Sequence, residues 1–118
     1  KMLATQRLLQ IKSGDKIKLL RENDIYLIEA LKKKTIIHTS GKAFEAGHSL
    51  KELEETLSGS IFFRTSRSYL VNIQKINHIK SFSRTSYEIS FRSKNCKAYL
   101  SSYLYGKFRR KCKDLNKR

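Results

Sequence analysis

The sequence predicts a mainly β fold in a single domain, with one or two short helices. Short half-apolar runs recur along the chain and are separated by turn residues, a pattern typical of strands joined by hairpins. Only one segment, at residues 49–57, carries strong helix signals. The 118 residues include no proline, repeat or low-complexity tract. This length fits one core without an internal linker, so we take residues 1–118 as one domain.

The first half of the chain predicts a hairpin followed by a central strand. Residues 7–20 contain two half-apolar runs on either side of a Ser-Gly-Asp turn, which favours a hairpin. In the next run, apolar side chains alternate onto both faces, as in a central strand. The alternating sets are Ile25, Leu27 and Glu29 against Tyr26 and Ile28. After a basic turn at residues 32–34, the β-branched run at residues 35–39 favours another strand.

The predicted helix begins with a capping box. Ser49 and Glu52 have the S-x-x-E spacing at which each side chain bonds the backbone N–H of the other residue. Three leucines then share one helical face, and Gly59 follows just past the predicted end. The helix's carboxylates complement its dipole, and no His or Asp follows at metal-ligand spacing. We therefore predict no metal site in this helix.

The second half predicts further strands and a terminal helix. Residues 72–79 are predicted to continue a strand, and residues 81–86 to form a turn. Residues 87–93 predict a strand whose inward side chains are Tyr87, Ile89 and Phe91. Residues 96–102 predict a further short strand. The spacing of four apolar residues then predicts a terminal helix, and these residues are Tyr103, Leu104, Phe108 and Leu115.

The segment FFRTSRSYLVN, at residues 62–72, combines apolar side chains with hydrogen-bond donors. Its apolar residues suit a buried strand, whereas its arginines and serines are the forked and hydroxyl donors that phosphate oxygens accept from. These donors are Arg64, Ser66, Arg67 and Ser68. The segment is therefore predicted to contact a phosphate backbone and not to catalyse a reaction.

This segment resembles the signature of the LytTR-type (LytR/AlgR family) DNA-binding domain of bacterial transcriptional regulators, F-x-R-x-H-R-S-Y-L-V-N followed by spaced isoleucines. The matching residues are Phe62, Arg64, Arg67, Ser68, Tyr69, Leu70, Val71 and Asn72, with Ile76 and Ile79 after them. Fragments at residues 24–30, 36–40 and 49–57 extend the resemblance over about residues 9–115. It implies small stacked antiparallel sheets with one or two short helices. It also implies that loops and strand ends enter the major groove of double-stranded DNA.

The resemblance assigns the four donors of residues 64–68 to the family's principal contact loop. Among them, Arg67 is best suited to donate two hydrogen bonds to a guanine. The alternative for Arg67 is a surface arginine held in a salt bridge. Lys33 and Lys34 fall near a second contact loop, although lysines in a turn are usually only solvated. Asn72 is expected to cap a turn through its side chain.

Two positions depart from the family's pattern. Ser66 stands where the family commonly has His, and Ser102 stands where the last strand commonly ends in Arg. Ser102 stays in the predicted contact set, but a base-reading arginine is missing there. Either the DNA specificity differs from that of typical members, or Lys107 and Arg109, with neighbouring Arg110, take over part of this contact. Basic residues near the C-terminus of a helix also stabilise it through the helix dipole, so this cluster has a structural explanation too.

The charge distribution favours a polyanionic partner. The chain has a formal net charge of +16 and a pI of about 10.1. Residues 1–55 hold 11 Lys or Arg against 8 Asp or Glu, whereas residues 56–118 hold 15 against 2. Double-stranded DNA is the expected partner. Phosphate contacts alone also fit RNA, and a protein-interaction or anionic-lipid module is the third reading.

Several other functions are not expected. No run of 18 apolar residues and no export signal is present, so we predict a cytoplasmic protein without a membrane span. His38, His48 and His78 are far apart, and no nucleophile or phosphate-loop motif appears, so no enzyme or cofactor is predicted. Cys96 and Cys112 lack metal-ligand spacing and are expected to be reduced thiols, with a redox bridge as the alternative.

The resemblance also concerns partners other than DNA. Family members are often output domains of two-component response regulators, joined to an N-terminal receiver domain. The chain is too short to contain a receiver, so we predict either an excised output domain or a stand-alone regulator. The resemblance also leads us to expect a second protomer on paired DNA sites. We make no prediction of the operator sequence.

Overall fold

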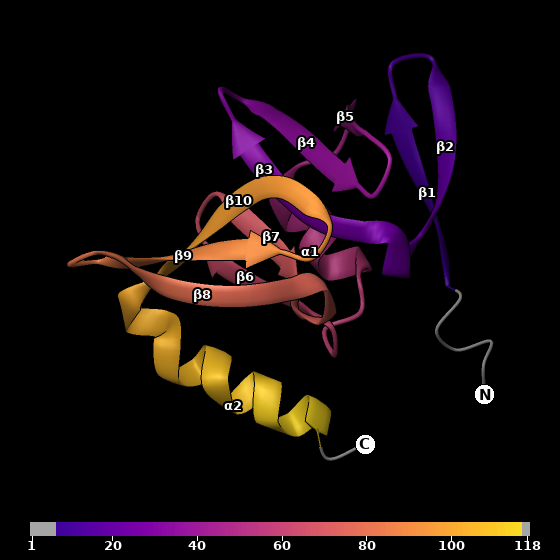
Figure 1. Cartoon of the computed structure of the whole chain (residues 1–118). Helices are drawn as coiled ribbons and strands as arrows, with labels where there is room; N and C mark the ends of the chain where they lie inside the picture. Colours follow the sequence, from indigo (N-terminus) through magenta and orange to yellow (C-terminus); the bar gives the residue numbers. More distant parts are fainter. Residues whose placement is uncertain (1–6, 117–118) are drawn as a thin grey trace.

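The computed structural model describes residues 7–116, which form three antiparallel sheets and two helices (Figure 1). A two-stranded sheet pairs β1 (Leu8–Ser13) with β2 (Lys16–Arg21). A five-stranded sheet has the order β5 (Ala43–Ala46), β4 (Lys34–Thr39), β3 (Ile25–Leu31), β7 (Tyr69–Asn72) and β6 (Phe62–Ser66). A three-stranded sheet has the order β10 (Lys94–Ser101), β9 (Ser86–Phe91) and β8 (Ile76–Ser83).

Two helices and three 3-10 turns complete the described part of the chain. They are α1 (Leu50–Thr56), α2 (Tyr105–Asn116), η2 (Glu22–Asp24), η3 (Ile73–Lys75) and η4 (Ser102–Leu104). This architecture confirms the predicted mainly β fold of small stacked antiparallel sheets with short helices. The single-domain prediction also included residues 1–6 and 117–118, which lie outside the described residues.

The five-stranded sheet separates two apolar cores. The first core contains side chains from β1, the sheet and α1, including Leu9, Ile11, Ile28, Leu53 and Leu70. The second contains side chains from the sheet, the three-stranded sheet and α2, including Leu27, Val71, Ile89, Leu100 and Phe108. Full burial of one such side chain contributes about 1.5–3 kcal/mol. Strands β3 and β7 are therefore fixed between the cores, together with the turns at their ends.

Strand β3 is central, between β4 and β7, as predicted. The predicted alternation of its side chains is wrong in part, because the pairing of β3 with β4 skips Tyr26 and forms a β-bulge. Ile25 therefore packs in the first core with Ile28, whereas Tyr26 and Leu27 both reach the second core.

The prediction that residues 72–79 continue one strand is wrong, because η3 separates β7 from β8. The buried side chain of Asn72 explains this break. Its Nδ2 donates to the carbonyl of Ile25 at 2.9 Å, and its Oδ1 accepts from the backbone N–H of Gln74 at 2.9 Å. Asn72 thus caps the turn, as predicted. The chain can then leave one sheet at β7 and enter the next at β8.

The N-terminal hairpin and α1 agree with prediction. Strands β1 and β2 pair in antiparallel register across the expected turn. Ser49 Oγ accepts from the Glu52 N–H at 3.0 Å, and Glu52 Oε1 accepts from the Ser49 N–H at 2.8 Å, which completes the capping box. No helix within residues 7–116 is long and apolar enough to cross a membrane.

Two boundaries near the C-terminus differ from prediction. The turn expected at residues 81–86 is shorter, because β8 and β9 leave only Arg84 and Thr85 between them. The terminal helix is confirmed as α2, with Phe108 buried. Tyr103, however, is 81% exposed and lies in η4, so it is not part of the apolar face of α2.

Candidate nucleic-acid interface

Two hairpin turns lie together at one end of the five-stranded sheet. Strand register places Tyr69, the first residue of β7, beside Glu29 near the end of β3. The backbone N–H of Ala30 also donates to the carbonyl of Ser68 at 2.9 Å. The β3–β4 turn and the β6–β7 turn are therefore neighbours, and the structure brings two predicted contact regions together.

The β3–β4 turn holds lysines in a constrained backbone. Lys32 and Lys33 have φ values of 50° and 67°, whereas Lys34 is the first residue of β4. Two consecutive positive φ values are typical of a type I′ hairpin turn, which favours Asn and Gly. Lysine in this left-handed region costs roughly 1–2 kcal/mol per residue. The side chains of Lys33 and Lys34 are exposed, so both predicted contacts are accessible to a ligand.

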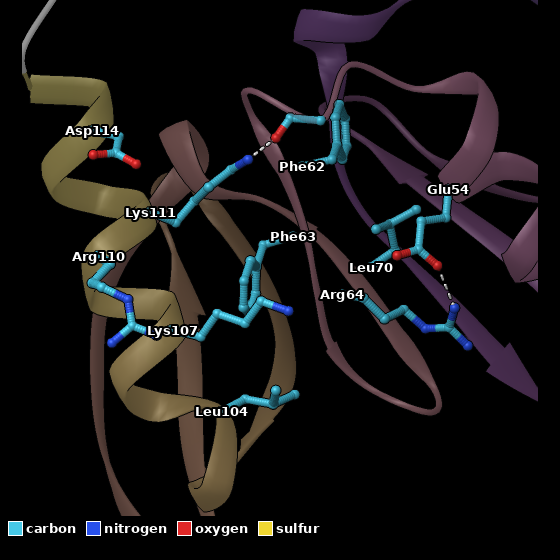
Figure 2. Close-up of a pocket in the computed structure, with 11 residues that line it drawn as sticks. Glu54, Phe62, Phe63, Arg64, Leu70, Leu104, Lys107, Arg110, Lys111 and Asp114 are labelled. Atoms are coloured by element: carbon cyan, nitrogen blue, oxygen red, sulfur yellow. Dashed lines mark hydrogen bonds and ion pairs between the residues drawn. The ribbon is translucent and has the colours of Figure 1, made fainter.

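Arg64 organises the β6–β7 turn. Its Nε donates to the carbonyl of Ser66 at 2.9 Å, and its Nη2 donates to the carbonyl of Arg67 at 2.8 Å. Its Nη1 pairs with Glu54 Oε1 on α1 at 2.7 Å (Figure 2). All three guanidinium nitrogens therefore have partners within the chain. This geometry gives Arg64 a positioning role, and its direct contact with DNA stays a prediction.

Replacement of Arg64 tests the positioning role. Arg64→Ala is expected to lower the free energy of unfolding by about 1–2 kcal/mol in urea titrations, because two turn carbonyls and Glu54 lose their donor. Arg64→Lys should recover little of this loss, since one ammonium group cannot reproduce the planar fork. Wild-type stability in Arg64→Lys would contradict the role assigned to the fork.

Arg67 lies at the tip of this turn. Ser66 Oγ accepts from the backbone N–H of Ser68 at 3.1 Å and closes the turn around it. The Arg67 side chain is exposed, and within the described residues its guanidinium has no hydrogen-bond or ion-pair partner. No acidic side chain within residues 7–116 pairs with Arg67, so the structure does not support the alternative of a salt-bridged arginine. The five N–H donors of Arg67 are available to a ligand.

Basic residues of α2 line a cleft between this helix and β6. The cleft has a volume of about 550 Å³, and Lys107 and Arg110 line it together with Arg64 and apolar side chains of β6 and β7. Figure 2 shows Lys107 and Lys111 extending from α2 toward the β6 side. Lys111 Nζ donates to the carbonyl of Gly59, so Lys111 holds α2 against the segment before β6.

Arg109 lies on a different face of α2. Its guanidinium lies 5.9 Å from the ring centroid of Tyr105, in a cation–π arrangement. The Tyr105 ring in turn stacks on Tyr87, with centroids 4.6 Å apart. The predicted contact residues of α2 are therefore divided: Lys107 and Arg110 line the cleft, whereas Arg109 does not.

Ser102 lies beside the β8–β9 turn, because its backbone N–H donates to the carbonyl of Thr85 at 2.8 Å. Ring contacts connect this region to the β6–β7 turn. The Tyr99 ring packs against Tyr69 with centroids 5.9 Å apart, and against Phe82 with centroids 4.9 Å apart. A backbone hydrogen bond therefore links Ser102 to the β8–β9 hairpin, and ring packing links this hairpin to the segment that carries Arg67.

The predicted contact set omits exposed side chains of this region, among them Phe82, Arg84 and Tyr103. One sequence signal could have identified Arg84, because residues 83–85 repeat the hydroxyl, arginine, hydroxyl order of residues 66–68. Exposure of the two aromatic residues depends on a β-bulge and on η4, which side-chain periodicity does not show.

The histidines and cysteines have local environments of their own. His38 Nε2 lies 2.6 Å from Glu29 Oε2, and His48 Nε2 accepts from a backbone N–H of β1 at 3.1 Å. Cys96 and Cys112 are free thiols, and burial raises the pKa of both, which lowers their thiolate fraction. Across residues 7–116, no three His, Cys, Asp or Glu side chains come together as a metal site.

Comparisons with known proteins agree with this architecture. The family model described as the LytTr DNA-binding domain matches residues 15–113. A solved LytTr DNA-binding domain from Bacillus cereus matches the fold with a TM-score of 0.76 and 23% identity, over 89% of this chain and 95% of that one.

Three curated relatives are transcriptional regulatory proteins. NatR of Bacillus subtilis is 26% identical over 91 residues, which are 77% of this chain and 39% of NatR. YpdB of Escherichia coli K12 is 35% identical over 65 residues, 55% of this chain and 27% of YpdB. LytR of Staphylococcus aureus N315 is 28% identical over 81 residues, 69% of this chain and 33% of LytR. The matched region therefore spans well under half of each relative.

Proposed function

Because this chain belongs to the LytTR DNA-binding domain family, we propose that it binds double-stranded DNA sequence-specifically, as the DNA-binding part of a bacterial transcriptional regulator. The observation that carries the proposal is the exposed Arg67 on the β6–β7 turn. Arg64 holds this turn in place, because it donates to two carbonyls of the turn and pairs with Glu54 on α1. Because the backbone of this turn is held in place before binding, it loses little conformational freedom on binding. Such a turn suits a contact that must be specific.

In the proposed complex, the β6–β7 turn enters the major groove. Arg67 donates two hydrogen bonds to the O6 and N7 atoms of a guanine, and Ser66 and Ser68 contribute hydroxyl groups. The major groove is about 12 Å wide and admits a two-stranded β-ribbon, so a hairpin turn fits it. Lys33 and Lys34, on the adjacent turn, contact phosphates that border the same groove.

The remaining predicted contacts are proposed to serve affinity more than specificity. Lys107, Arg109 and Arg110 are exposed on two faces of α2, so we assign them to phosphates at separate positions. Phosphate contacts position a protein without reading sequence directly. Ser102 offers a hydroxyl group close to the β8–β9 turn. Binding through several cations should weaken steeply with salt.

The relatives are longer than the matched region, so we propose that the domain acts within a larger cytoplasmic protein. A receiver domain is the expected companion if that protein is a response regulator. Two protomers on paired half-sites are the expected arrangement on DNA, and a footprint of one protomer would contradict it. The proposal includes no catalytic step and no cofactor.

Selection of bound duplexes from a randomised DNA library tests the proposed function. We expect one motif to be enriched. Fluorescence anisotropy should then show at least about 10³-fold tighter binding to the selected duplex than to a scrambled duplex. A matching RNA duplex and single-stranded RNA should bind no better than scrambled DNA. Equal and steeply salt-sensitive binding to all of them would contradict sequence specificity and favour the RNA or general polyanion reading.

A further inference from the structure

We infer that the β8–β9 turn is an additional DNA-contacting element, in which Arg84 binds a backbone phosphate outside the base pairs that Arg67 reads. The inference rests on the proposed function, because it requires that the domain bind duplex DNA. It assigns a ligand to an arginine that is absent from the predicted contact set.

The β8–β9 turn shares a serine-to-backbone hydrogen bond with the β6–β7 turn. Ser83 Oγ accepts from the backbone N–H of Thr85 at 3.2 Å, as Ser66 Oγ accepts from that of Ser68 at 3.1 Å. In each case a serine hydroxyl closes the backbone around a central arginine. Ser83 Oγ also lies 2.8 Å from Ser86 Oγ, which further fixes the turn. Both turns therefore present an arginine from an ordered backbone.

Arg84 has no acidic partner in its surroundings. Its side chain is exposed, and within the described part of the chain its guanidinium makes no hydrogen bond or ion pair. Residues 56–118 contain only two acids, Glu88 and Asp114. Glu88 Oε1 already lies 3.9 Å from the ammonium groups of both Lys80 and Lys97. This cationic environment is suited to an anionic ligand such as a phosphate.

The position of the turn favours a flanking contact. Contacts among Tyr69, Tyr99 and Phe82 tie the β8–β9 hairpin to the segment that carries Arg67. Figure 1 shows the β8–β9 turn projecting from the same side of the molecule as the β3–β4 turn, at the left of the view, and extending beyond the rest of the domain. A duplex bound at the β6–β7 turn would continue past this tip, where its phosphates are the accessible groups.

Arg84→Gln tests the inference, with Arg92→Gln as the matched control. Arg92 lies at the opposite end of the same sheet, and glutamine keeps a donor for the carbonyl of Gln74 that Arg92 contacts. Loss of one phosphate contact should reduce the slope of log affinity against log salt by about 0.9. Because of this difference in slope, the ratio of wild-type affinity to Arg84→Gln affinity should be about eightfold larger at 0.1 M salt than at 1 M salt. The loss should be equal for selected and scrambled duplexes, and Arg92→Gln should keep the wild-type slope.

Shortening the duplex from its ends locates the contact. Wild-type protein should lose affinity at the step that removes the flanking phosphate, whereas Arg84→Gln should lose nothing at that step. Arg84→Lys, which keeps a cation for a phosphate, should restore most of the affinity and the salt slope.

A wild-type salt slope in Arg84→Gln, or a loss confined to the selected duplex, would overturn the inference. The slope can be measured on any duplex. If the protein binds all duplexes equally, the proposed specificity is contradicted, but the salt slope of Arg84→Gln still shows whether Arg84 contacts a phosphate.

Discussion

Asn72→Ala is expected to lower the free energy of unfolding by about 2–4 kcal/mol, because it removes two hydrogen bonds from a fully buried site. The carbonyl of Ile25 would lose its partner at a buried site, and the backbone N–H of Gln74 would lose the acceptor that caps the turn. A buried carbonyl left without a partner costs about 1–3 kcal/mol, and loss of a side-chain cap costs about 0.5–2 kcal/mol more. Urea unfolding followed by circular dichroism measures the change.

Asn77→Ala provides the matched control for this prediction. Asn77 is exposed on β8, and its amide lies 3.3 Å from the ring of His78. Its replacement should change stability by less than about 0.5 kcal/mol. If both variants unfold at the same urea concentration, the cap is not the interaction that separates β7 from β8.

The parts of the fold that sequence could predict are those determined by local chemistry. The capping box of Ser49 and Glu52 satisfies N–H groups only three residues apart, so its pattern is visible in the sequence. The apolar runs on both faces of β3 predict a central strand because no exposed position could accommodate them. In both cases the pattern lies within one short stretch of the sequence.

The features that prediction missed depend on distant partners. The bulge at Tyr26 arises from pairing with β4, and the break after Asn72 arises because its amide bonds to Ile25, 47 residues away. The alternation of apolar residues along a strand gives no sign of either contact. It therefore predicts a regular strand through both the bulge and the break.

The candidate site shows the same division. The segment at residues 62–72 identifies a donor-rich turn, but sequence does not distinguish the arginine that fixes the turn from the arginine that it presents. Arg64 bonds to Glu54 and to two carbonyls of its own turn, whereas Arg67 has no such partners within the described residues. Lys111 follows Arg109 and Arg110 in one basic run, and sequence does not show that its Nζ donates to the carbonyl of Gly59.

This difference between Arg64 and Arg67 gives the functional prediction with the largest effect. Arg67→Ala is expected to weaken binding to the selected duplex by about 1–3 kcal/mol, or roughly 5-fold to 150-fold in Kd. The reason is the loss of two hydrogen bonds to one guanine, a loss that a scrambled duplex should show to a much smaller extent. Anisotropy with both duplexes, and with one carrying a substitution at each guanine in turn, would identify the base pair that Arg67 reads.

Lys107→Ala is the comparison that separates base reading from charge. Lys107 is exposed at the cleft and is assigned to a phosphate, so its removal should weaken binding to selected and scrambled duplexes alike. Each variant removes one positive charge, so a difference between their sequence preferences cannot come from net charge. Equal losses on both duplexes from both variants would remove Arg67 from the reading role and leave it as one more phosphate contact.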